Sequence, residues 1–98
     1  MKLRIRGDSV RLRLTRPETE QLGNGEAVSQ TTEFAGGGIL RTTLAPTTDD
    51  RMSAQFDNNV LTVSAPRTAL RDWATSNQVT LNCDQHNPPQ ILVEKDFA

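Results

Sequence analysis

Arginine is the residue type whose spacing points most clearly to chemistry in this sequence. Five arginines fall within the first sixteen residues: Arg4, Arg6, Arg11, Arg13 and Arg16. The first four occupy alternate positions of two short stretches, and alternate side chains of an extended strand point to the same face. Because guanidinium groups bind phosphate in a bidentate geometry, such a face could neutralise several phosphates of a nucleic acid. The opposing interpretation is a solvated face whose charges are screened or paired with Glu18, Glu33 or Asp96.

Charge is distributed unevenly along the chain. Residues 1–16 carry six basic residues against one acidic residue, whereas the remainder carries five basic and eleven acidic residues. The first segment therefore has a net charge of +5 and the rest a net charge of −6, for a total of −1. This balance excludes a general polyelectrolyte attraction to nucleic acid and confines any such contact to the first segment.

Two other groups of residues have the composition of chemical sites but lack the necessary partners. Cys83 and His86 form a Cys-x-x-His pair, but the chain has one cysteine and one histidine, and structural zinc needs four ligands. A catalytic Cys–His pair would also need an orienting group and an oxyanion hole. The glycines at 36–38 lack the spacing of a phosphate loop, so we expect a turn there. We predict no catalytic residue, no metal site and no cofactor, and hence no enzyme.

Composition indicates one small cytoplasmic domain spanning residues 1–98. The apolar fraction of 35% and charged fraction of 23% suit a polar globular chain rather than a disordered one. A single cysteine cannot form an internal disulfide, which fits a reducing compartment. The first residues lack the apolar core of a signal peptide, and no apolar stretch approaches the roughly 20 residues of a membrane span.

Alternating patterns define the elements expected in the first half. Residues 2–6 and 10–14 alternate between apolar and basic side chains on either side of a Gly-Asp turn, which predicts a β-hairpin. Thr15 and Glu18 have the spacing of a helix capping box, and Pro17 suits the first helical turn. We therefore expect a short helix that contains Leu22. Strands over 27–34 and 39–45 and a polar linker over 46–50 should follow.

The second half repeats this order of elements. We expect strands over 52–56 and 61–65, a helix from Pro66 that buries Trp73 in the core, and strands over 79–81 and 91–97. A gapless offset of 51 residues places Met1, Leu3, Ile5, Val10, Leu12, Leu14, Leu22 and Val28 on Met52, Ala54, Phe56, Leu61, Val63, Ala65, Trp73 and Val79. This predicts a duplication with halves 1–45 and 52–97. The competing explanation is that any two alternating hairpins can be slid into agreement.

Part of the sequence resembles the swapped-hairpin AbrB/MazE family. The residues that carry the resemblance are Gly7-Asp8-Ser9-Val10-Arg11-Leu12-Arg13-Leu14, Pro17, Glu20-Gln21-Leu22-Gly23 and Glu26-Ala27-Val28. It covers about residues 3–30 and, more faintly, 54–81. Members are transcription regulators and antitoxins that interleave two ββαββ chains into one barrel, so the resemblance implies that two tandem units form the equivalent of a fused dimer.

The ends of the chain also resemble a small uncharacterised bacterial family, through the opening residues and the closing segment Ile91-Leu92-Val93-Glu94-Lys95-Asp96-Phe97. The charge pattern departs from that of the AbrB/MazE family, whose DNA contacts come from both halves of its two-fold. At the offset of 51, the equivalents of Lys2, Arg4, Arg6, Arg11 and Arg13 are Ser53, Gln55, Asp57, Thr62 and Ser64. Arg16 alone keeps its charge, as Arg67.

These observations predict a β-rich fold, a small barrel of two tandem β-β-α-β-β units with two short helices. We expect a non-catalytic binding module that contacts nucleic acid or another anion through the five arginines. The alternative is a protein–protein module, antitoxin-like or oligomerising, with no nucleic-acid role. A more distant alternative is a triphosphate-tunnel enzyme, whose bore would be lined by arginines and carboxylates.

Overall fold

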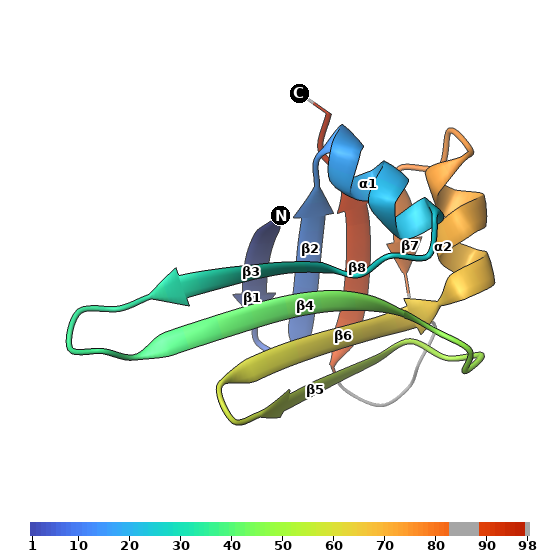
Figure 1. Ribbon diagram of the computed structural model, residues 1–98. Helices are drawn as coiled ribbons and strands as arrows, with labels where there is room; N and C mark the ends of the chain where they lie inside the picture. Colours follow the sequence, from blue (N-terminus) through green and yellow to red (C-terminus); the bar gives the residue numbers. More distant parts are fainter. Residues whose placement is uncertain (83–88, 98) are drawn as a thin grey trace.

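The computed structural model describes residues 1–82 and 89–97, and within them the chain forms eight strands and two helices (Figure 1). The first half contains β1 (Lys2–Arg6), β2 (Ser9–Leu14), α1 (Arg16–Gly23), β3 (Val28–Glu33) and β4 (Ile39–Thr47). The second half contains β5 (Ser53–Asp57), β6 (Val60–Pro66), α2 (Arg67–Ala74), β7 (Thr80–Asn82) and β8 (Gln90–Lys95). The β-rich class predicted from the sequence is confirmed.

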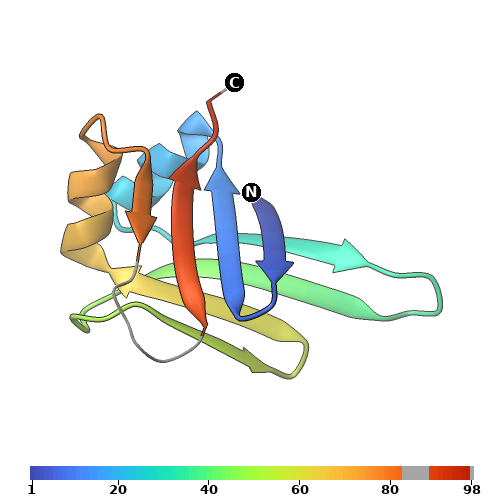
Figure 2. The same ribbon diagram turned by 180° about the vertical axis from the view of Figure 1, so that it is seen from behind.

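Each sheet combines one hairpin from each half of the chain. One sheet has the order β1-β2-β8-β7 and the other the order β3-β4-β6-β5. The hairpins are antiparallel within themselves and join through parallel contacts, β2 with β8 and β4 with β6. Strands of one sheet run across those of the other, and both helices lie together beside one end of the sheets (Figures 1 and 2). The two halves are therefore interlocked rather than packed side by side.

A barrel was predicted, but the described residues do not form a single closed sheet. Both sheets are open, with β1 and β7 at the edges of one and β3 and β5 at the edges of the other. The local pattern predicted the strands correctly but carried no information on whether their outer edges would meet. β4 also runs longer than expected, because it continues beside β6 through Pro46 and Thr47, part of the predicted linker.

The two sheets have matching hydrogen-bond registers over most of their length. Leu44 pairs with Val63 of β6, and Val93 pairs with Leu12 of β2. Since Leu12 and Val63 match at the offset of 51, Leu44 and Val93 occupy equivalent positions in the two sheets. The residue opposite Leu44 is Val28, and the residue opposite Val93 is Leu81. The gapless match of Val28 with Val79 is therefore wrong, and Val79 is 55% exposed whereas Val28 is buried. The connection after α2 is longer than the one after α1, which shifts the register; the duplication itself stays a prediction.

The core lies between the sheets and beneath the helices. Its members are Val10, Leu12, Leu14, Leu22, Val28, Leu44, Met52, Leu61, Val63, Ala65, Leu70, Trp73, Ile91 and Val93. Trp73 is fully buried, as predicted, and its indole Nε1 donates a hydrogen bond to the carbonyl of Val79 at 3.0 Å. Ile5 and Phe56 do not follow the predicted pattern: both are more than half exposed, because the opposite sheet does not cover these ends of the edge strands.

The start of α1 carries the predicted capping box. The Thr15 hydroxyl accepts from the Glu18 backbone N–H at 3.4 Å, and the Glu18 carboxylate accepts from the Thr15 backbone N–H at 2.9 Å. The same carboxylate pairs with the amine of Met1 at 2.8 Å. Burial raises the pKa of Glu18, but the hydrogen bonds from the Met1 amine and from Thr15 lower it more, so the pKa lies below its ordinary value of 4.5.

The helices meet where Gly23 of α1 contacts Ala74 of α2. A Cβ atom added at Gly23 would lie 2.7 Å from the Cβ of Ala74, closer than any two such carbons can pack. Both residues are the last of their helices and match at the offset of 51. The close approach therefore joins equivalent points of the two halves, and at least one of the two positions must lack a side chain.

Gly23→Ala should destabilise the domain, because the new methyl group has no room unless the two helices separate. We expect a loss on the order of 1–3 kcal/mol in the free energy of unfolding, typical of overpacking, measured by denaturant titration. The matched control moves the methyl group from one helix to the other, in the double variant Gly23→Ala with Ala74→Gly. This variant should regain part of the lost stability, but not all of it, because glycine at position 74 lowers helix propensity. A double variant no more stable than Gly23→Ala alone would contradict this account.

Glu18→Gln should lower stability at neutral pH but keep the capping box, since glutamine can also bond the N-cap backbone. The lowered pKa of Glu18 means that its charge stabilises the fold above about pH 4.5, and that this contribution disappears as the pH falls through the lower folded-state pKa. The stability gap between wild type and Glu18→Gln should therefore narrow between pH 6 and pH 3 in thermal melts. Glu20→Gln, an exposed position on the same helix, is the control; a gap that stays constant over this range would refute the prediction.

Candidate anion-binding face

The outer face of the β1-β2 hairpin gathers five basic side chains. Lys2, Arg4 and Arg6 alternate along β1 with Leu3 and Ile5, and Arg11 and Arg13 alternate along β2 with core residues. The ladder places Lys2 opposite Arg13 and Arg4 opposite Arg11. We call these five residues the basic face: Lys2, Arg4, Arg6, Arg11 and Arg13. The predicted clustering of the four strand arginines on one outward surface is what the register produces.

Like charges face each other across this hairpin. Side chains directly opposite in an antiparallel pair have Cβ atoms about 4.5–5.5 Å apart, and like charges there are destabilising. Two carboxylates offset part of the repulsion: Glu94 of β8 bonds Arg11 at 2.8 Å, and Asp96 bonds Lys2 at 3.1 Å. The face is thus partly neutralised, at one residue of each strand: Lys2 on β1 and Arg11 on β2.

Three guanidinium groups of the basic face have no carboxylate partner among the described residues. Arg4, Arg6 and Arg13 take part in none of the ion pairs within the described part of the chain, and all three are exposed. Two of them lie on β1, an edge strand, where charged residues also serve to prevent pairing with another sheet. Protection of the edge accounts for charge on β1 but not for Arg13, which lies on an inner strand.

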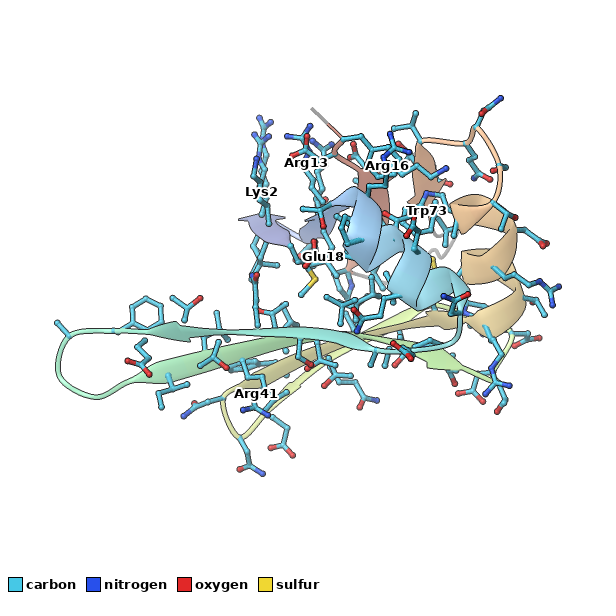
Figure 3. All side chains as sticks on the ribbon, turned by 45° about the horizontal axis from the view of Figure 1, so that its top comes forward. Lys2, Arg13, Arg16, Glu18, Arg41 and Trp73 are labelled. Atoms are coloured by element: carbon cyan, nitrogen blue, oxygen red, sulfur yellow. The ribbon has the colours of Figure 1, made fainter. Side chains whose placement is uncertain are left out.

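Arg16 lies apart from the basic face. It is the first residue of α1, beyond the end of β2, and its guanidinium lies 4.2 Å from the centre of the Phe97 ring. Figure 3 shows Lys2, Arg13 and Arg16 on one side of the molecule and Arg41 on the opposite side. The five arginines grouped by the sequence therefore divide into a sheet face and a separate helix-end position.

The counter-charges differ from those expected. Asp96 pairs with Lys2, Glu18 pairs with the Met1 amine, and Glu33 lies on β3 of the other sheet. Glu94 was not expected to contribute. Its role depends on the parallel contact between β2 and β8, which sets Glu94 opposite Arg13 and within reach of Arg11. A contact between strands so far apart in sequence has no local signal.

The corresponding face of the β5-β6 hairpin carries no basic residue. The register places Ser53, Gln55 and Asp57 of β5 opposite Ser64, Thr62 and Val60 of β6. Thr43 of β4 and Ser29 of β3 continue this surface, with their hydroxyl oxygens 2.9 Å apart, and Arg41 of β4 lies on the same face as Thr43. In the part of the chain that the structure describes, the basic face is therefore present once, not twice.

The other candidate sites provide no chemistry within the described residues. Cys83 and His86 lie outside them. Gly36 and Gly37 form the predicted turn, with φ angles of 91° and 95° that favour glycine, and the Phe34 N–H donates to the Gly38 carbonyl at 2.7 Å. Among the described residues no group of three or more His, Cys, Asp or Glu is placed to hold a metal ion. No helix found there has the length and apolar character needed to cross a membrane.

Comparison with protein families gives a match over the whole chain. The model of a family of unknown function, DUF7009, matches residues 1–98. The chain belongs to this family. Neither the curated proteins nor the solved structures yield a match. The expected membership of an uncharacterised family is confirmed, whereas the AbrB/MazE resemblance finds no support in these comparisons.

Proposed function

We propose that this DUF7009 chain is a non-catalytic cytoplasmic module that contacts the phosphate backbone of nucleic acid through the basic face. The observation that carries the proposal is the cross-strand stacking of like charges, Arg4 opposite Arg11 and Lys2 opposite Arg13, with three arginines left unneutralised. An anionic partner would relieve this repulsion. The core beneath the hairpin holds these side chains on a fixed sheet surface. Such a surface suits contact with the phosphate backbone of a nucleic acid rather than insertion into one of its grooves.

The proposed contact is short, one-sided and largely independent of base sequence. The acidic remainder, at −6, opposes a long contact, and the β5-β6 hairpin, which has no basic residue, offers no matching half-site. The exchange of hairpins between halves is the arrangement that the AbrB/MazE resemblance implies for a fused dimer. If that relation holds, one half has kept the charges and the other has lost them, and palindromic recognition is not expected.

The triphosphate-tunnel alternative receives no support from this geometry. Such an enzyme would need arginines on the inner wall of a closed sheet. Here the inward positions of β2 are Val10, Leu12 and Leu14, all buried, and the arginines alternate with them toward solvent.

Titration of a labelled short duplex at about 50 mM salt tests the proposal. With three unneutralised arginines each engaging one phosphate, the slope of log K against log salt should be about −3. Arg4→Ala combined with Arg13→Ala should abolish binding with little change in melting temperature, because exposed charges contribute little to stability. The same measurement with scrambled duplexes should give equal affinity.

Arg41→Ala combined with Arg67→Ala is the matched control, because it removes the same charge from positions off the basic face. This variant should bind as the wild type does. Loss of binding in both double variants would indicate a response to net charge alone. No binding by the wild type at high micromolar concentration would exclude the nucleic-acid proposal.

A second candidate function, a protein–protein module, is favoured by exposed apolar residues on the β3-β4 hairpin. This hairpin projects beyond the edge of the other sheet in both views (Figures 1 and 2). Phe34 is 55% exposed and Ile39 49% exposed at its end. If this surface mediates self-association, the mass measured by light scattering should rise with concentration, and Phe34→Ser combined with Ile39→Ser should keep the protein monomeric; a constant monomer mass would remove self-association.

A further inference from the structure

Two open pockets each include the first residue of a helix. The first, of about 420 Å³, lies where the start of α1 meets the end of α2 and the end of β8, and is lined by Arg16, Lys95, Phe97, Val79, Ser76 and Asn77 among others. The second, of about 510 Å³, lies at the start of α2 and includes Arg67, Thr47, Thr48, Asp49 and Asp50. Arg16 and Arg67 are the first residues of their helices, and each pocket is completed by the end of β8 or β4.

The two pockets differ in charge. The charged residues that line the first pocket are Arg16 and Lys95, with no carboxylate among the described lining. In the second pocket, Arg67 is accompanied by Asp49 and Asp50. The first pocket therefore attracts an anion, and the second carries a net negative charge.

The cations of the first pocket are held in place by neutral partners. The Arg16 guanidinium lies over the Phe97 ring at 4.2 Å and takes part in no ion pair within the described residues. The Lys95 ammonium donates to the Ser76 carbonyl at 2.6 Å and lies 5.6 Å from the centre of the Trp73 ring. Both cations thus keep donors available for a ligand, and neither has to break an ion pair to use them.

Apolar surface lies beside these charges. Phe97 is 39% exposed and Val79 is 55% exposed, although both contact the pocket. Binding sites for small molecules combine such apolar walls with a few polar groups, in volumes of about 300–1,000 Å³. The equivalent of Phe97 beside the second pocket is Thr48, so that pocket lacks the aromatic wall as well as the excess positive charge.

We propose that the first pocket binds a small organic anion, a carboxylate or phosphate attached to an aromatic or other apolar group. Arg16 and Lys95 bind the anionic group, and the apolar part packs against Phe97 and Val79. This site is separate from the basic face and goes beyond the proposed contact with nucleic acid.

The single tryptophan reports on this pocket. The Trp73 indole N–H donates to the carbonyl of Val79, a pocket residue, and the ring lies near the Lys95 ammonium. Its indole N–H resonance is unique in the chain, because the sequence contains one tryptophan. A ligand in the pocket should therefore shift one resolved signal in a ¹H–¹⁵N correlation spectrum.

The experiment titrates phenyl phosphate, and in a parallel arm benzoate, into the full chain and follows the Trp73 indole signal. At least one of the two should give a saturable shift, and the arm that binds more tightly distinguishes a phosphate ligand from a carboxylate. Benzyl alcohol, which lacks the charge, should give none. Arg16→Gln should weaken binding about tenfold or more, the effect expected when a charge-assisted hydrogen bond is lost.

Three further variants make the test specific. Arg67→Gln, at the corresponding position of the second pocket, should leave the affinity unchanged. Phe97→Ala should weaken binding of phenyl phosphate more than that of inorganic phosphate. Arg4→Ala combined with Arg13→Ala should retain binding, which separates this site from the basic face. Absence of a saturable shift with both ligands, or equal loss in Arg16→Gln and Arg67→Gln, would overturn the proposal.

Discussion

The parallel contacts between β2 and β8 and between β4 and β6 hold this structure together. Each joins a strand of one half to a strand of the other, and each lies at the centre of its sheet. Neither half forms a complete sheet of its own, so the core forms only when each sheet contains one hairpin from each half. The helices add a second link, since α1 and α2 approach to the limit allowed at Gly23 and Ala74.

Placing both halves in one chain allows the two sheets to differ. In a symmetric pair of identical chains, a charge gained on one outer face would appear on both. Here the face of the β1-β2 hairpin is strongly basic, whereas the matching face of the β5-β6 hairpin carries serine, threonine, glutamine and one aspartate. For the same reason the two pockets can differ in charge. The pocket that includes Arg16 is bordered by Lys95 and Phe97, and the pocket that includes Arg67 is bordered by Asp49 and Asp50.

The proposed functions use different consequences of this asymmetry. On the basic face, strand pairing forces like charges into register, and the repulsion is only partly offset by Glu94 and Asp96. At the start of α1, Arg16 is held by an aromatic ring rather than by a carboxylate. An extended polyanion suits the first arrangement, because its charges repeat along a surface. A small anion suits the second, because the charges converge beside apolar walls.

The sequence alone determined the features that depend on neighbouring residues. Alternation placed Leu12 inward and Arg11 outward, the Thr15–Glu18 spacing produced the capping box, and helical spacing placed Trp73 in the core. These succeed because side-chain direction and helix capping follow from local backbone geometry. The longer connection after α2, compared with the one after α1, was not predicted, because a gapless offset cannot detect an insertion.

Only the tertiary structure decided which strands meet and what they bring together. The contact of β2 with β8 joins Arg11 to Glu94 across more than eighty residues, and the end of β8 sets Phe97 beneath Arg16. The opening of the sheets left Ile5 and Phe56 exposed where alternation had placed them inward. Periodicity fixes the face on which a side chain lies, but the partner opposite that face depends on contacts distant in sequence, which local patterns do not encode.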